Sequence, residues 1–87
     1  MKNYLISFNW VNEDNDLASN LRLKIEANSE NSVQIFPNQL AVKSALAIED
    51  LYNSLLPEAK DTRISIVEFT NFFAKPYPID EFRALGF

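Results

Sequence analysis

The chain has 87 residues, a formal net charge of −4, and neither cysteine nor histidine. These counts exclude disulfides, thiolate chemistry, zinc sites built from cysteine or histidine, and catalysis by histidine. The length allows one domain spanning residues 1–87, and the 47% of apolar residues can supply its core.

The charge pattern bears on possible partners. The basic residues are scattered along the chain, so the sequence shows none of the clustered cations that phosphate binding needs. No stretch approaches the roughly 20 apolar residues of a membrane span. Met1 to Asn3 lead into an alternating segment and not into a signal-peptide core. We therefore expect a cytoplasmic protein without a membrane partner, and leave nucleic-acid binding open.

The first predicted element is a strand within Lys2 to Val11. Its side chains alternate, so one face would carry Tyr4, Ile6, Phe8 and Trp10, and the other Leu5, Ser7, Asn9 and Val11. The aromatic face is large enough to be the core side. The mixed face suits a half-exposed sheet surface or a partner.

An acidic loop, Asn12 to Asp16, follows this strand. Asn15 or Asp16 is a plausible N-cap for a helix from about Leu17 to Ala27. Leu17, Leu21 and Ile25 recur every four residues and predict its apolar stripe. Glu13, Asp14 and Asp16 could also hold a metal, although such clusters are more often solvated caps.

The middle of the chain predicts a hairpin and a second helix. Strands at Ser32 to Phe36 and Gln39 to Ser44 are separated by Pro37-Asn38, a turn that does not fix the register. Ser44 is the expected N-cap of a helix running from Ala45 to about Leu56, and Pro57 is expected to end it. The predicted core stripe of this helix is Ile48, Leu51, Tyr52 and Leu55.

The last predicted strand runs from Arg63 to Thr70. Ile64 and Ile66 share one face and Ser65, Val67 and Phe69 the other. Apolar residues on both faces indicate a central strand, or an edge that a partner covers. The aromatic segment that follows is expected to pack on the domain or on a second subunit.

The order strand, helix, strand, strand, helix, strand is the split βαβ pattern of ferredoxin-like domains. We therefore predict an α+β fold with a four-stranded antiparallel sheet, two helices on one face, and a short aromatic C-terminal extension. The other sheet face, with Leu5, Ser7, Asn9 and Val11, would stay open. In a chain of this size such a face often becomes a dimer interface.

Two segments resemble a known family. Met1 to Asn9, MKNYLISFN, resembles the opening of small Cas-two-like proteins, whose first strand ends in Ser-Tyr-Asp or a close variant. Leu40 to Phe69 resembles the back half of the same group, with a Val-Lys-Thr/Ser strand, a helix, a Leu-Leu-Pro stop and a final hydrophobic strand. The nearest subset is called SinR-like, and GhoS-type antitoxins share the architecture.

The resemblance implies a ferredoxin-like homodimer. In catalytic members the aspartate at the end of the first strand binds a divalent metal for phosphodiester cleavage, and that position falls on Asn9. A carboxylate offers a hard cation a charged ligand, whereas an amide offers only a neutral carbonyl. We therefore expect no catalytic residue, no metal and no cofactor at this position.

The leading hypothesis is a non-catalytic dimeric interaction protein: an antitoxin, an adaptor, or an inhibitor of a nucleic-acid-acting system such as a toxin–antitoxin or CRISPR-related one. Its candidate binding residues are Ser7, Asn9 and Trp10. Its candidate dimer or partner surface comprises Leu5, Val11, Phe69, Phe72, Phe73 and Tyr77.

Two alternatives remain open. The first is a metal-dependent nuclease that uses magnesium or manganese, with ligands from Glu13, Asp14, Asp16 or Glu68. The second is a single-stranded nucleic-acid-binding module that stacks bases on an open sheet, an idea prompted by Phe8 and Trp10.

Overall fold

A computed structural model describes residues 1–9, 15–60 and 62–71, with residues 15–18 described by their backbone alone. Four strands and two helices follow one another in the order that the sequence predicts: β1 (Lys2–Phe8), α1 (Asn15–Ala27), β2 (Asn31–Phe36), β3 (Gln39–Ser44), α2 (Ile48–Ala59) and β4 (Ile64–Glu68). The predictions made for Trp10 to Asp14 and for residues 72–87 lie outside the described residues.

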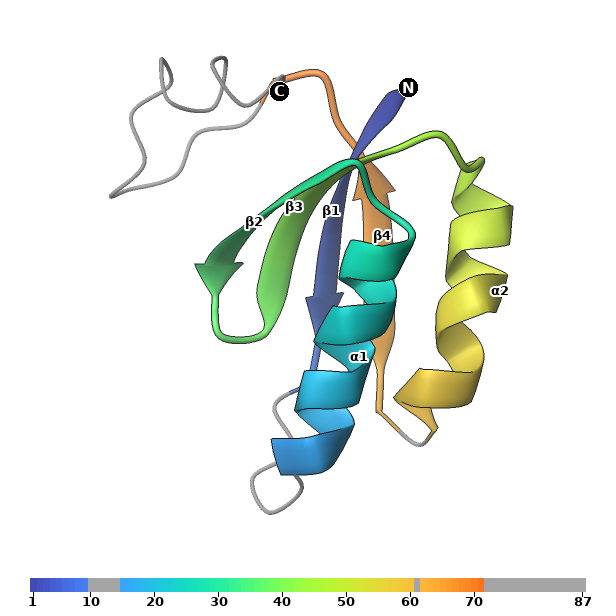
Figure 1. The fold of residues 1–87 in the computed structure, drawn as a ribbon. Coiled ribbons are helices and arrows are strands. Elements are labelled where there is room, and N and C mark those ends of the chain that lie inside the picture. Colours follow the sequence, from blue (N-terminus) through green and yellow to red (C-terminus); the bar gives the residue numbers. More distant parts are fainter. Residues whose placement is uncertain (10–14, 61, 72–87) are drawn as a thin grey trace.

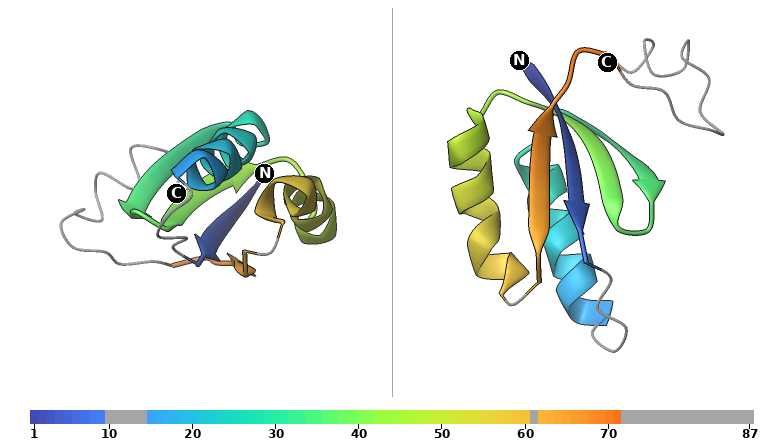
Figure 2. Two further views of the ribbon diagram at one scale, coloured as in Figure 1. Left: turned by 90° about the horizontal axis from the view of Figure 1, so that it is seen from below. Right: turned by 180° about the vertical axis from the view of Figure 1, so that it is seen from behind.

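The four strands form one antiparallel sheet in the order β2-β3-β1-β4 (Figure 1). This order confirms the predicted α+β fold and is compatible with a ferredoxin-like domain. Both helices lie on one face of the sheet, as the view from below in Figure 2 shows. The opposite face, called the open face from here on, is covered by neither helix.

The core lies between the sheet and the helices. Tyr4, Ile6 and Phe8 of β1 are at most 4% exposed and pack with buried residues of both helices and of β3. The alternation of β1 was therefore predicted with the correct face inward. In α1, Leu21 and Ile25 are fully buried, which confirms two members of the predicted stripe.

The sequence left two positions open for β4, a central strand or an edge strand covered by a partner, and the structure excludes the central one. The strand lies at the edge of the sheet, and the central strands are β1 and β3. Ile64 and Ile66 are only partly buried against the core, while Val67 is 52% exposed. The apolar character of both faces of β4 does not come from a second neighbouring strand within the described chain.

The second helix begins and ends later than predicted. Its N-cap residue is Ala47, which has an extended backbone, and no side chain makes a capping hydrogen bond there. Pro57 lies inside the helix, whose last residue is Ala59 and whose C-cap is Lys60, with a φ of 50°. Pro57 is in the last turn and exposed, so water can satisfy the carbonyl that loses its hydrogen bond.

The stripe of α2 also differs. Leu51, Leu55 and Ala59 form the buried stripe, each at most 1% exposed, whereas Ile48 and Tyr52 are 38% and 43% exposed. The predicted stripe was therefore correct for Leu51 and Leu55 and wrong for the other two. The buried stripe runs further toward the C-terminus because the helix itself does.

Ser44 closes the end of β3 instead of capping α2. Its hydroxyl donates to the Asn28 carbonyl (2.6 Å) and accepts from the Leu46 N–H (3.2 Å), and the residue is 1% exposed. The Asn28 amide in turn donates to Ser54 Oγ at 3.2 Å. This network joins β3 to the C-terminal end of α1 and to α2.

Replacing Ser44 with alanine is expected to lower the free energy of unfolding by about 1–3 kcal/mol, because a buried N–H and a buried carbonyl lose their partner. Urea unfolding followed by circular dichroism measures this change. Ser32→Ala provides a matched control, since Ser32 is exposed on β2, and a loss no larger than in this control would contradict the assignment.

Tyr4 carries a second buried hydrogen bond. Its hydroxyl donates to the Leu46 carbonyl at 2.7 Å, and its side chain is fully buried. Burial raises the pKa of Tyr4 above its ordinary value of 10.0, with a smaller opposing effect of Lys2 and a smaller reinforcing effect of Glu68. The folded state therefore holds the phenol proton more tightly than the unfolded chain does.

The contribution of Tyr4 to stability is complete below about pH 10 and is lost as the pH rises through the raised folded pKa. The stability difference between the unmodified protein and Tyr4→Phe should therefore stay constant up to about pH 10 and shrink as the pH rises further. Urea titrations of both proteins on both sides of this pH test the expectation. A constant difference would show that the phenol titrates alike in both states, and a growing difference would show that folding lowers its pKa; either result contradicts the expectation.

Candidate functional site

Asn9 lies at the tip of β1, in a polar cleft. Its side chain is exposed, and its backbone N–H donates to the Arg63 carbonyl at 3.0 Å. The preceding N–H, that of Phe8, donates to the Asn38 carbonyl at 3.0 Å. The tip of β1 is thus held between the β2–β3 turn and the start of β4. Described residues around this cleft of about 250 Å³ are Ser7, Phe8, Asn9, Asn38, Arg63, Ile64 and Ser65.

Two of the three candidate binding residues lie at this cleft. Ser7 and Asn9 both line it, and the Ser7 hydroxyl accepts a hydrogen bond from Gln39 Nε2 at 3.0 Å. Arg63 is the one charged residue among its described lining residues. Amides, hydroxyls and a guanidinium suit polar or anionic groups better than a hard divalent cation. The third candidate, Trp10, lies outside the described residues.

The nuclease hypothesis named Glu68 as a possible metal ligand, and the sheet register places it far from Asn9. Asn9 lies beside Arg63, whereas Glu68 pairs with Tyr4. At about 3.3 Å per residue, Glu68 is roughly 17 Å away along β4. Its carboxylate lies 3.5 Å from the Lys2 ammonium.

The other carboxylates of that hypothesis are not positioned by the structure. Glu13 and Asp14 lie outside the described residues, and Asp16 is described only by its backbone in α1. Among the side chains that the structure describes, no group of three carboxylate, cysteine or histidine residues could hold a metal ion.

Phe8 does not offer a stacking surface for bases. The ring is 4% exposed and belongs to the core between sheet and helices. Of the two rings that prompted the nucleic-acid hypothesis, one is therefore buried in the core, and the other, Trp10, is not described.

A continuous apolar row crosses the open face. Val33 pairs with Ala41, Ala41 with Leu5, and Leu5 with Val67. Because directly opposed side chains in antiparallel strands share a face about 5 Å apart, these four form one row over all four strands. Val67 is 52% exposed, Leu5 and Val33 are half-buried, and Ala41 between them is fully buried. Tyr4, Ile6 and Phe8 point to the helices, so this row points away from them.

Polar residues flank the apolar row on both sides. Asn3 pairs with Lys43 in the row toward the start of β1, and Ser7 pairs with both Gln39 and Ser65 in the row toward its end. Phe69 follows β4 in the first of these rows, where its N–H donates to the Asn3 carbonyl at 3.0 Å. Leu5 and Phe69, two members of the predicted partner surface, therefore lie on the same face.

The remaining predicted members of this surface, Val11, Phe72, Phe73 and Tyr77, lie outside the described residues. Sequence reasoning placed Val67 on the face opposite Ile64 and Ile66 but did not include it in the surface. It also did not place Asn38 and Arg63 beside Asn9. The missing signals were the pairing of β1 with β3, which brings Asn38 to the end of β1, and the pairing of β1 with β4, which brings Arg63 there.

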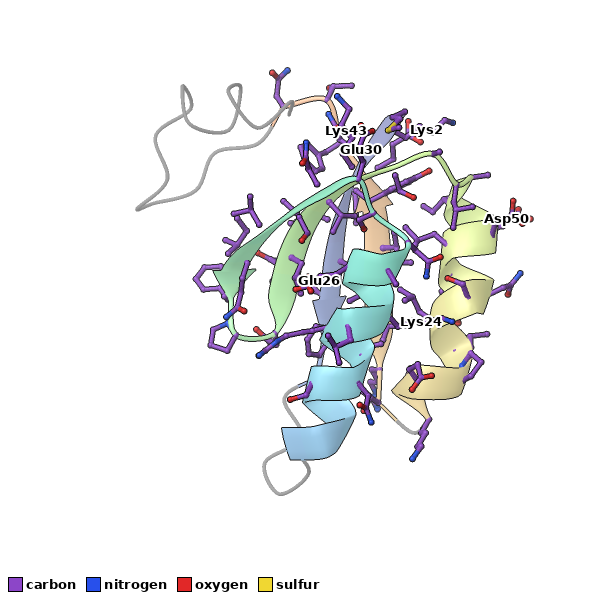
Figure 3. All side chains as sticks on the ribbon, in the orientation of Figure 1. Lys2, Lys24, Glu26, Glu30, Lys43 and Asp50 are labelled. Carbon is purple, nitrogen blue, oxygen red and sulfur yellow. The ribbon has the colours of Figure 1, made fainter. Side chains whose placement is uncertain are left out.

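Charged side chains gather at the end of the sheet where β1 begins. Figure 3 shows Lys2, Glu30 and Lys43 in this region, while Asp50 points away from the sheet on α2. Lys2 lies opposite Ser44, one position from the Asn3–Lys43 pair. The Asn9 cleft is at the other end of β1, so the two polar regions of the sheet are separated by its length.

A comparison with known proteins matches this chain to no family model and to no curated relative. Within the part of the chain that the structure describes, neither helix has the length and apolar character needed to cross a membrane.

Proposed function

We propose that this chain is a non-catalytic interaction protein that forms a homodimer through its open sheet face. The observation that carries this proposal is the apolar row Val33–Ala41–Leu5–Val67. The resemblance of Met1–Asn9 and Leu40–Phe69 to Cas-two-like proteins supports a role as an antitoxin, an adaptor, or an inhibitor of a nucleic-acid-acting system.

The arrangement of the open face fits a protein interface. Its centre is an apolar row, and its rim consists of polar residues, including Lys43, Ser7 and Ser65. Interfaces between identical subunits combine such an apolar centre with a polar rim. In a two-fold dimer the same patch serves both copies, so the two rows would cover each other. Burying Val67 in this way removes its exposed apolar surface from water.

The chemistry of the Asn9 cleft supports a non-catalytic role. Asn9 contributes a neutral amide at the position where the resembled catalytic proteins carry a metal-binding aspartate. Its described neighbours in the cleft are hydroxyls, amides, apolar groups and Arg63. A positively charged arginine among the residues of the cleft disfavours binding of a divalent cation by charge repulsion.

Sedimentation velocity over a range from about 1 µM to about 500 µM tests the proposed dimer. The expected result is a reversible shift from monomer to dimer, or a dimer throughout the range. A monomer at every concentration would overturn the proposal.

The protein is expected to leave single-stranded RNA, double-stranded DNA and single-stranded DNA intact in the presence of magnesium or manganese. The physical reason is the missing carboxylate at Asn9, because an amide binds a hard cation weakly. Gel analysis at high protein concentration measures this outcome. Cleavage that EDTA abolishes, and that Asn9→Ala or the loss of the carboxylate at Glu13, Asp14, Asp16 or Glu68 removes, would contradict the non-catalytic role. Cleavage that all of these variants retain would indicate a contaminant.

A further inference from the structure

A groove runs between α2 and β4. It lies on the helical side of the sheet, opposite the open face. Its described lining consists of Ile48, Glu49, Tyr52, Asn53 and Ile66, and its volume is about 450 Å³. This volume falls within the roughly 300–1,000 Å³ of typical ligand sites. Ile48 and Tyr52, on successive turns of α2, leave 38% and 43% of their surface exposed.

The floor of this groove is the outer edge of β4. The Asn9 N–H donates to the Arg63 carbonyl, and the Phe69 N–H donates to the Asn3 carbonyl, both at 3.0 Å. In an antiparallel pair the residues between such bonded pairs direct their backbone groups the other way. Ile64, Ile66 and Glu68 therefore turn their N–H and C=O groups away from β1. The described chain places no strand against this edge.

The two edges of the sheet differ in how they are built. The register of β2 shifts between Gln34 and Phe36, and Pro37 follows the strand directly. Bulges and prolines are features that prevent strand addition at an edge. β4 pairs with β1 without a register shift, and it contains neither proline nor lysine. The edge of β4 is therefore the one suited to a further strand.

We propose that the α2–β4 groove binds an extended peptide segment of another protein, which adds as a fifth strand to β4. The peptide would lie about 4.8 Å from β4. Its side chains opposite Ile66 would enter the groove and contact Ile48 and Tyr52. Recognition of this kind takes affinity from backbone hydrogen bonds and specificity from pockets for alternate side chains.

The charge around the groove defines the chemistry of the peptide. α2 carries Glu49, Asp50 and Glu58 and no basic residue within Ile48–Ala59. Glu49 lines the groove itself, and Glu68 lies at the C-terminal end of the β4 edge, partly neutralised by Lys2 at 3.5 Å. The segment that fits therefore has apolar residues at alternate positions and a lysine or arginine near the Glu49 end.

Selection from a random nonapeptide library displayed on phage, with the full chain as bait, tests this inference. The expected result is enrichment of sequences with alternating apolar residues and at least one lysine or arginine. Synthetic versions of the enriched peptides are then titrated by fluorescence anisotropy. No enrichment, or enrichment without the basic residue, would overturn the proposal.

Three variants locate the binding. Tyr52→Glu is expected to weaken the selected peptides at least tenfold, because it places a charge against their apolar side chains. Glu49→Gln should weaken peptides that carry lysine or arginine about two- to fivefold, and leave binding of the same peptides with glutamine in that position unchanged. Leu23→Glu, at a 63% exposed position of α1, is the control and should bind normally. Equal binding by Tyr52→Glu and Leu23→Glu would exclude the groove.

Hydrogen exchange distinguishes a bound peptide at the β4 edge from two other occupants, another part of the same chain and a second copy of the chain. Without peptide, the amides of Ile64, Ile66 and Glu68 should exchange quickly at all protein concentrations and slow when peptide binds. Slow exchange that does not depend on concentration would show that the chain itself covers the edge, and slowing with concentration would indicate a second copy. Either result overturns the proposal. Binding by Val67→Lys should be retained, so this inference and the proposed dimer can fail separately.

Discussion

Replacing Val67 with lysine is expected to weaken self-association by at least a hundredfold. Val67 forms the most exposed end of the apolar row, at 52%. If two copies place this row at a common interface, each would bury an ammonium that has no partner, and the interface would bring two like charges close together. Either effect costs several kcal/mol. Sedimentation velocity at matched concentrations of variant and unmodified protein measures the change.

Leu23→Lys is the matched control for this experiment. It adds the same charge at a position that is 63% exposed on α1, on the helical side of the sheet. We expect this variant to associate like the unmodified protein, and both variants to keep the thermal midpoint within a few degrees, since surface substitutions usually change stability by less than about 0.5 kcal/mol. Equal weakening by both lysines would mean that net charge, and not the open face, controls association.

Replacing Ile6 with alanine is expected to lower the free energy of unfolding by about 2–5 kcal/mol. Ile6 is fully buried in β1 and lies between Leu40 of β3 and Ile66 of β4. A domain of this size has a total stability of about 5–15 kcal/mol, so the loss is a large fraction of it. Urea unfolding followed by tryptophan fluorescence and circular dichroism gives the midpoint and the slope.

The control for this experiment is Leu23→Ala, which removes the same number of carbon atoms from an exposed position. It should lower the stability by less than about 1 kcal/mol. Similar losses for Ile6→Ala and Leu23→Ala would show that the cavity expected at Ile6 is absent, and that the core is arranged differently from the described structure.

The fold was predictable because alternation and turn residues act locally. The period of two in β1 can bury only one set of side chains, and the aromatic set is the larger. Pro37-Asn38 interrupts the hairpin at the correct position, as the bounds of β2 and β3 show. The order of elements then leaves few arrangements in which short connections join a packed sheet and its helices.

The ends of α2 and the role of β4 were not predictable from local signals. Ser44 is a good capping residue, but in the structure its hydroxyl bonds with Asn28 and Leu46. Pro57 is tolerated because it falls in an exposed last turn. Ile48 and Tyr52 have helical spacing with Leu51 and Leu55, and periodicity alone does not show where a sheet ends. These two side chains line the groove beside β4, the edge strand of the sheet, and stay partly exposed there.

Local signals also predicted only part of the candidate site. Alternation placed Leu5, Ser7 and Asn9 on one face of the first strand, and the structure confirms the face of Leu5 and Ser7. The neighbours of these residues come from other strands. The row from Val33 to Val67 depends on three pairings whose registers a single sequence does not fix.

We propose above that this protein acts through contact of its open face with a second copy of itself. Isotope-filtered NMR on an equimolar mixture of labelled and unlabelled protein tests it most directly. We expect intermolecular NOEs from the methyl groups of Leu5, Val33 and Val67 to the same groups of the second copy. Intermolecular NOEs confined to Ile48, Leu56 and other residues on the helical side, or none in a sample that sediments as a dimer, would contradict it.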